Sequence, residues 1–255
     1  SFGAKQMVEE GVMKDVDAIF GLHIWAQLEA GKVGYRSGPF LAAVDNLDVT
    51  ITGTQAHGAS PWSSVDPIVT ASQAIMGLQT ILSRSVNITQ NPAVVTVGAI
   101  HGGIRHNIIP EKVELIGTIR TFGDEQQALV HRRITEIITN IAESAGAKAD
   151  VNIGKLYPST VNDPDLTSKA IPSMVAAAGE GNVVVMDPVT GAEDFSFFQR
   201  EKPGFFIMLG GMKQGLDPTK VPSHHTPDFH IEEDGFKLGV RTLSYFVVDY
   251  MGMKK

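Results

Sequence analysis

The chain of 255 residues is long enough for one large or two modest domains with a buried core. Its composition, with 43% hydrophobic and 19% charged residues, excludes a disordered, collagen-like or coiled-coil protein. A formal net charge of -7 disfavours nucleic acid as a partner, and the lack of cysteine excludes a disulfide scaffold, a thiol nucleophile and a cysteine-ligated metal.

The longest apolar stretches, such as residues 204–211, are far shorter than the ~20 residues that cross a bilayer. No membrane partner is therefore expected. No signal peptide opens the sequence, and the acidic composition fits the cytoplasm, although a signal peptide that had been removed would leave the same sequence.

The first segment, residues 1–44, begins with a predicted helix over residues 4–13. A strand follows over 17–24 and is apolar on both faces, which is typical of a central strand in a sheet covered by helices on both sides. A second strand is predicted over 32–37, and Gly38-Pro39 after it marks a boundary.

The second segment, residues 45–155, has a different pattern. Leu47, Val49 and Ile51 alternate with polar residues, which predicts a strand over 47–52 with one solvated face. The other elements expected here are a helix, two strands, a helix and a strand, at 66–83, 93–100, 113–122, 124–145 and 148–156. This β-α-β-β-α-β order predicts an inserted ferredoxin-like α+β domain, with two helices on one face of an antiparallel sheet.

The third segment, residues 156–255, resumes the alternation of the first. We expect helices and strands in turn at 165–178, 183–186, 195–200, 204–209 and 234–251. The sequence therefore predicts an α/β protein in which residues 1–44 and 156–255 share one sheet.

Three histidines are candidate metal ligands, because neutral imidazole is the commonest one. His23 is expected at the carboxyl end of its strand, where α/β sheets bind ligands. His224 and His225 lie in a polar loop before the last helix. Each has a simpler interpretation, as a core histidine or as part of a surface turn, and two histidines alone make an incomplete metal site.

The inserted segment carries further candidates. His57 lies in a turn that needs glycine and proline but no histidine. Asn107 and Arg120 carry an amide and a guanidinium, which suit a carboxylate ligand. Near the end of the chain Asp194 could simply cap the next helix, which leaves Glu193 as a candidate for lining a cleft.

Together these stretches resemble the two-metal aminoacylase and carboxypeptidase family, in its hippurate hydrolase and indoleacetyl-amino-acid hydrolase branch. The resemblance rests on six stretches in matching order and spacing: Asp17-Ala18-Ile19-Phe20-Gly21-Leu22-His23, Gly53-Thr54-Gln55-Ala56-His57-Gly58-Ala59-Ser60-Pro61, Asn107-Ile108-Ile109-Pro110, Gly117-Thr118-Ile119-Arg120-Thr121-Phe122, Gly191-Ala192-Glu193-Asp194-Phe195 and His225-Thr226-Pro227-Asp228-Phe229.

The resemblance implies part of a metallopeptidase-type catalytic domain with an inserted lid and dimerisation domain. It implies that His23 and His225 bind metal, and that His57 acts in the active site of a partner subunit. It further implies that Asn107 and Arg120 bind the carboxylate of the substrate. Two divalent ions, Zn or Mn, an N-acyl-amino acid substrate and a homodimer are the expected cofactors and partners.

The family's Cys-Gly-His-Asp motif and Glu-Glu pair, which supply further ligands and the general base, have no counterpart in these residues. The resemblance therefore implies amide hydrolysis by a metal-activated water in the complete enzyme, and an inactive chain in isolation. A dipeptidase or carboxypeptidase of the same family, and a non-catalytic dimerising module, are the alternatives.

Overall fold

The computed structural model describes residues 3–253 and divides into two compact units. The first unit comprises the residues up to Leu41, Thr160–Val189 and those from Glu193 onward, and the second comprises Ala42–Ser159 with Thr190–Ala192. Both units combine helices with a sheet, so the mixed α/β class is confirmed.

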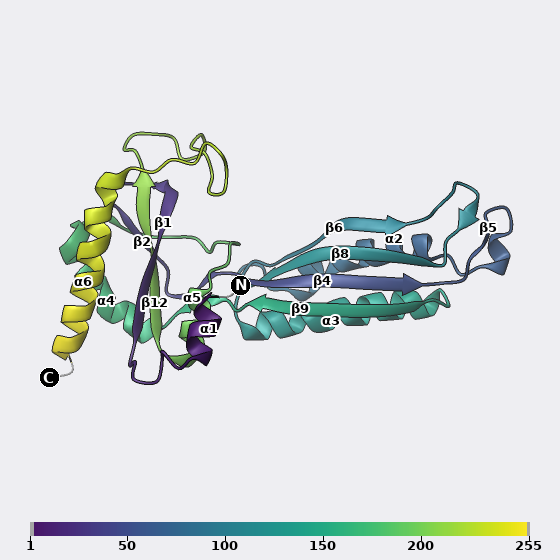
Figure 1. The fold of residues 1–255 in the computed structure, drawn as a ribbon, viewed down its shortest axis with the longest axis horizontal. Coiled ribbons are helices and arrows are strands. Elements are labelled where there is room, and N and C mark those ends of the chain that lie inside the picture. The colour runs from purple at the N-terminus through teal and green to yellow at the C-terminus, as the bar shows by residue number, and fades with distance from the viewer. Residues whose placement is uncertain (1–2, 254–255) are drawn as a thin grey trace. The chain divides into compact units, whose positions relative to one another are not determined.

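The first unit is built on a four-stranded mixed sheet (Figure 1). Its order is β1 (Ile19–Glu29), β12 (Gly204–Met212), β2 (Val33–Tyr35) and β11 (Val183–Val185). β1 runs parallel to β12, and β2 runs antiparallel to β12 and parallel to β11. Every residue of β12 is buried, as is typical of a central strand. The strand expected to be central, β1, lies at the edge of the described sheet instead and is mostly half-buried.

Helices cover both faces of this sheet. α4 (Pro164–Ala178) and α6 (Phe236–Met253) pack on one face, where Phe205 and Phe246 lie in the core. α5 (Phe195–Glu201) packs on the other face, where Phe195 contacts the side chain of Phe206. The short helix α1 (Gly3–Glu9) and the 3-10 turn η3 (Glu233–Gly235) complete the unit.

Two local features differ from the sequence-based expectation. β1 continues to Glu29, beyond the end predicted at residue 24, because its pairing with β12 extends that far. Gly38-Pro39 opens a strand, β3 (Gly38–Leu41), that pairs with β10 (Thr160–Asn162). A strand that short, and paired with residues ~120 positions away, has no local pattern that would reveal it.

The second unit contains the predicted β-α-β-β-α-β order. Its main elements are β4 (Ala43–Thr52), α2 (Pro67–Thr80), β6 (Val94–Gly102), β8 (Lys112–Thr121), α3 (Asp124–Ser144) and β9 (Lys148–Tyr157). The sheet is antiparallel throughout, in the order β6-β8-β4-β9. The inward-facing side chains of β4 pack with both helices in one core, which leaves the other sheet face open.

Short elements complete this unit. Asp66 caps α2 by accepting hydrogen bonds from the backbone N–H groups of Ile68 and Val69. A π-helical turn, η2 (Ile81–Ser85), ends that helix. The 3-10 turn η1 (Pro61–Ser63) follows β5 (Ala56–His57), which pairs with β7 (Ile108–Ile109). None of the described helices has both the length and the apolar character of a membrane span.

Candidate functional site

His23 lies in the middle of β1, and the expectation that it ends the strand is therefore wrong. Its Nδ1 forms a hydrogen bond with the carbonyl oxygen of Ile24. Since a carbonyl oxygen only accepts, the proton lies on Nδ1 and the Nε2 lone pair remains available. Metal-binding histidines are typically oriented in this way, by a backbone acceptor on the other ring nitrogen.

The loop after β12 brings a second imidazole to His23. The ring centroids of His23 and His224 are 5.3 Å apart, and His224 also lies against the rings of Trp25 and Phe229. Its Nε2 accepts a hydrogen bond of 3.0 Å from the backbone N–H of Ala26. Ala26 lies where the pairing register of β1 with β12 shifts, between Trp25 and Glu29.

Burial lowers the pKa of His224, and the neighbouring rings of His23 and His225 lower it further. A lowered pKa keeps the imidazole neutral, as an acceptor at Nε2 must be. Because Nε2 accepts the Ala26 N–H, the proton of the neutral ring lies on Nδ1, and neither nitrogen of His224 offers a free lone pair to a metal. His224 therefore supports the site by packing and by holding the loop on β1.

His225 is exposed and has a backbone φ of +63°, the only positive value among the non-glycine residues that the structure describes. Its ring centroid lies 6.4 Å from that of His224. Strained left-handed residues other than glycine cluster at functional sites, where the surroundings enforce them. The imidazole packed on His23 is thus that of His224, and the strained residue next to it is the predicted ligand His225.

Glu193 and Asp194 lie before α5 and have different partners. Burial raises the pKa of Glu193, and the electrostatic attraction of His23 partly opposes this. Asp194 does not cap α5 with its side chain, so that interpretation is wrong. Its carboxylate instead accepts a hydrogen bond of 2.9 Å from Ala4 N–H at the start of α1. The carbonyl oxygen of Glu193 accepts the bonds from Ser196 in its place.

The donors gathered in the first unit are imidazole nitrogens and one carboxylate, which suit Zn or Mn. No group of three or more His, Asp or Glu side chains within residues 3–253 could hold a metal ion by itself. The residues present therefore fit part of a metal site, with His23 Nε2 as its best-oriented donor.

Arg120, in the second unit, lines an open pocket of about 560 Å³. The other lining residues are Val44, Val94, Thr118, Tyr157, Thr190, Gly191 and Ala192. Burial lowers the pKa of Arg120, and the nearby carboxylate of Asp45 opposes this. The guanidinium stays charged because its ordinary pKa is so high, and it can receive an anion in this pocket.

His57 and Asn107 lie together at the other end of the second unit. The Gly58 N–H donates to the Asn107 carbonyl oxygen at 2.8 Å, and the Ala59 N–H donates to His57 Nδ1 at 3.0 Å. Lys112 and Arg120 are eight residues apart on β8, which is about 27 Å at the rise of an extended strand. One chain therefore does not bring Asn107 and Arg120 to the same carboxylate.

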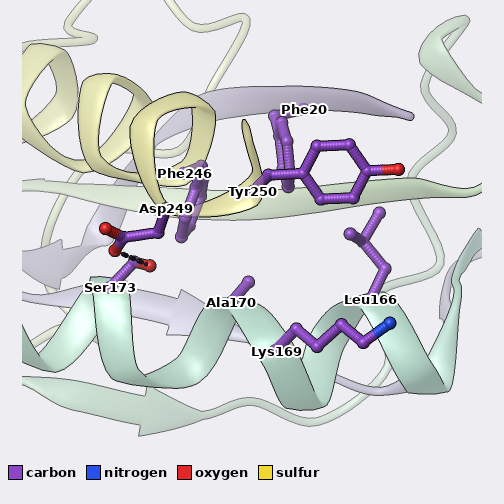
Figure 2. Close-up of a pocket in the computed structure, with 8 residues that line it drawn as sticks. All are labelled: Phe20, Leu166, Lys169, Ala170, Ser173, Phe246, Asp249 and Tyr250. Carbon is purple, nitrogen blue, oxygen red and sulfur yellow. Dashed lines mark hydrogen bonds between the residues drawn. The ribbon is translucent and has the colours of Figure 1, made fainter. Parts of the chain in front are cut away.

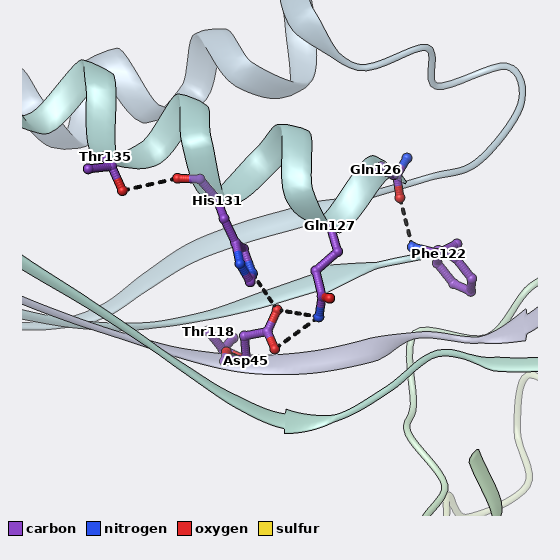
Figure 3. A network of polar contacts seen from close by, with 7 residues as sticks. All are labelled: Asp45, Thr118, Phe122, Gln126, Gln127, His131 and Thr135. Atoms are coloured by element: carbon purple, nitrogen blue, oxygen red, sulfur yellow. Dashed lines mark hydrogen bonds and ion pairs between the residues drawn. The ribbon is translucent and has the colours of Figure 1, made fainter. Parts of the chain in front are cut away.

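Sequence reasoning missed a polar network between β4 and α3 (Figure 3). Asp45 is completely buried, and its carboxylate accepts hydrogen bonds from Gln127 Nε2 at 3.0 and 3.1 Å. His131 Nε2 lies 2.6 Å from the same carboxylate. Asp45 shares the two-residue period of the inward-facing Leu47 and Val49, so a charged residue at a core position was the available signal.

A small cavity of about 10 Å³ lies between α4 and α6 in the first unit (Figure 2). Phe20 and Phe246 form its apolar wall, and Ser173 Oγ donates a hydrogen bond of 2.5 Å to Asp249 at its rim. It has room for one water molecule at most, so it is not a ligand site.

Comparison with known proteins matches residues 1–249 to the peptidase family M20/M25/M40. An Arabidopsis thaliana protein named IAA-amino acid hydrolase ILR1-like 2 is 35% identical, over 99% of this chain and 57% of its own length. Thermostable carboxypeptidase 2 of Saccharolobus solfataricus is 34% identical, over 93% of this chain and 59% of its own length. The YXEP protein of Bacillus subtilis is described as a dinuclear metal binding peptidase. Its structure is 29% identical with a TM-score of 0.75, over 96% of this chain and 60% of its own length. The chain thus spans about three-fifths of the length of these relatives.

Proposed function

The chain belongs to the peptidase family M20/M25/M40, whose members are metal-dependent hydrolases, and we propose that it forms part of an enzyme that hydrolyses the amide bond of N-acyl-amino acids. The observation that carries this proposal is His23, with its Nε2 lone pair available, beside the His224-His225 loop. The name of the similar plant protein, an amino acid hydrolase, supports this substrate class.

His23 and His225 would hold metal together with ligands from outside these residues. When bound, two divalent ions would lower the pKa of a water molecule and polarise the amide carbonyl. Glu193, which is half-buried, would line the cleft beside His23. Arg120 would bind the carboxylate of the amino-acid part by charge-assisted hydrogen bonds.

We also propose that the second unit is a lid through which two copies of the chain associate. Ile68, Val69 and Met76 on α2 are 40%, 55% and 70% exposed, and β6 is an edge strand of the sheet. Exposed apolar side chains beside an unpaired edge suit a protein partner. A second copy would place His57 and Asn107 at its partner's metal site, which accounts for their distance from Arg120.

In this arrangement His57 would donate a hydrogen bond to the developing oxyanion of the partner's substrate, a contribution of typically ~3 kcal/mol. Mixed dimers of wild-type and His57→Ala subunits test this role. If His57 acts in trans, the site that loses activity in each mixed dimer is the metal site of the wild-type subunit. A pattern in which only the substituted subunit's own metal site fails would contradict it.

The substrate class is tested by comparing hydrolysis of N-acyl-amino acids with hydrolysis of dipeptides by the complete enzyme. We expect acyl-amino acids to be preferred. The similarity to a carboxypeptidase favours C-terminal peptide hydrolysis as the second candidate, since a free carboxylate suits Arg120 in both cases. A higher kcat/KM for peptides would replace the first assignment by the second.

The 255 residues by themselves are expected to bind metal weakly and to hydrolyse nothing, because the described residues supply only part of the site. Calorimetric titration with zinc and an assay with hippurate test this expectation. Tight zinc binding or measurable hydrolysis would overturn it.

A further inference from the structure

The second unit contains a buried carboxylate on the opposite side of the sheet from Arg120. Asp45 lies on the inward face of β4, with Leu47 and Val49, and is completely buried. Arg120 lies on the neighbouring strand β8, in the open pocket on the other face. Arg120 is paired with Val44, the residue before Asp45, so only the thickness of the sheet separates the two charged side chains.

The side chains that contact Asp45 hold its carboxylate group in position. Gln127 Nε2 donates hydrogen bonds to both of its oxygens, and His131 Nε2, one turn further along α3, lies 2.6 Å from one of them (Figure 3). Because Asp45 is completely buried, its field is screened much less than that of a surface carboxylate.

We propose that Asp45 weakens the attraction of Arg120 for a substrate carboxylate, and so sets the affinity of the pocket for anions. This inference rests on the proposed function, in which Arg120 binds that carboxylate. Asp45 does not touch the substrate. Its negative charge repels the bound anion across the sheet and so partly offsets the attraction of Arg120, and the electrostatic attraction between Asp45 and Arg120 agrees with a field that reaches across the sheet.

The predicted effect has a sign that structural damage does not produce. Replacing Asp45 by Asn removes a negative charge and should tighten the binding of an anion, whereas a disturbed pocket binds more weakly. We take the Asp45 carboxylate and the bound anion to be on the order of 10 Å apart. Coulomb's law then gives an increase in anion affinity of about twofold in a water-like dielectric and about fifteenfold at an effective dielectric of about 20. The terminal amide of Gln127 can rotate, so that its oxygen accepts from the new Asn side chain.

The test measures the affinity of the complete enzyme for two ligands, the product amino acid and its primary amide, by calorimetry. These ligands differ only in the carboxylate. In Asp45→Asn the amino acid should bind two- to fifteenfold more tightly, and the amide should bind as in the wild type. Asp48→Asn is the matched control, because Asp48 lies on the same strand but is exposed and screened by solvent.

Equal changes for both ligands, no change, or weaker binding of the amino acid would overturn the inference. If Asp45→Asn is insoluble, Asp45→Thr removes the same charge with a residue that favours strands, and the same two affinities are compared. Failure of the proposed function is seen separately, as an enzyme that hydrolyses no N-acyl-amino acid. If hydrolysis occurs and the affinities do not move, only the role of Asp45 is refuted.

Discussion

Removing the guanidinium of Arg120 gives the most direct test of the substrate site. Arg120→Met keeps an unbranched apolar stem against Val44 and Tyr157 in the pocket but removes the charge and every donor. A hydrogen bond to a charged group contributes about 1.5–3 kcal/mol, which corresponds to a factor of about 10 to 150. We therefore expect KM for N-acyl-amino acids to rise by about 10- to 150-fold, with a much smaller change in kcat.

The assay compares KM for each N-acyl-amino acid with KM for the corresponding N-acyl-amino acid amide, which has no carboxylate for Arg120 to bind. Arg120→Lys keeps the charge without the bidentate geometry and should lie between wild type and Arg120→Met. Arg132→Ala is the control, since this arginine is exposed on α3 in the same unit. An unchanged KM, or an equal rise for the amide, would show that Arg120 does not bind the carboxylate.

Three further predictions concern the metal site and the fold. His23→Ala should lower the metal content of the complete enzyme, measured by mass spectrometry, whereas His224→Ala should largely retain it because its Nε2 bonds the chain backbone; equal losses would contradict this difference. Gly210→Ala should destabilise the protein by about 3 kcal/mol in urea denaturation, because its Cβ would lie 1.9 Å from a backbone oxygen of β1. Gly154→Ala has open space and should be neutral, so equal stabilities of the two variants would refute the packing argument. Asp194→Ala should lower the free energy of unfolding by about 1 kcal/mol, because the first turn of α1 loses the hydrogen bond from Ala4 N–H to Asp194. An unchanged denaturation midpoint would argue against a contribution of that hydrogen bond.

Much of the fold could be predicted because its signals are local. The alternation of Leu47, Val49 and Ile51 identified both the strand β4 and its buried face. Asp66 and Asp163, each followed by proline, begin α2 and α4 as capping residues do. The apolar run over residues 17–24 predicted the strand β1 but not its place, because β1 lies at the edge of the described sheet and is mostly half-buried.

The site was predictable only as a set of residue types in sequence order. His23, Glu193 and the His224-His225 loop do lie in one unit, and burial and electrostatics link Glu193 to His23. The sequence did not reveal that His224 would accept the Ala26 N–H. That bond depends on a loop closing over a strand almost 200 residues earlier in the chain.

The sequence by itself determined most of the helices and strands, the inward face of such strands as β4, and a set of candidate site residues. Only the tertiary structure decided their partners: Asp194 bonds α1 instead of its own helix, Asp45 is buried behind Arg120, and Asn107 lies a strand's length from Arg120. The physical reason is that periodicity and capping depend on neighbours within a few residues. Distances between side chains depend on how whole strands and helices pair and pack.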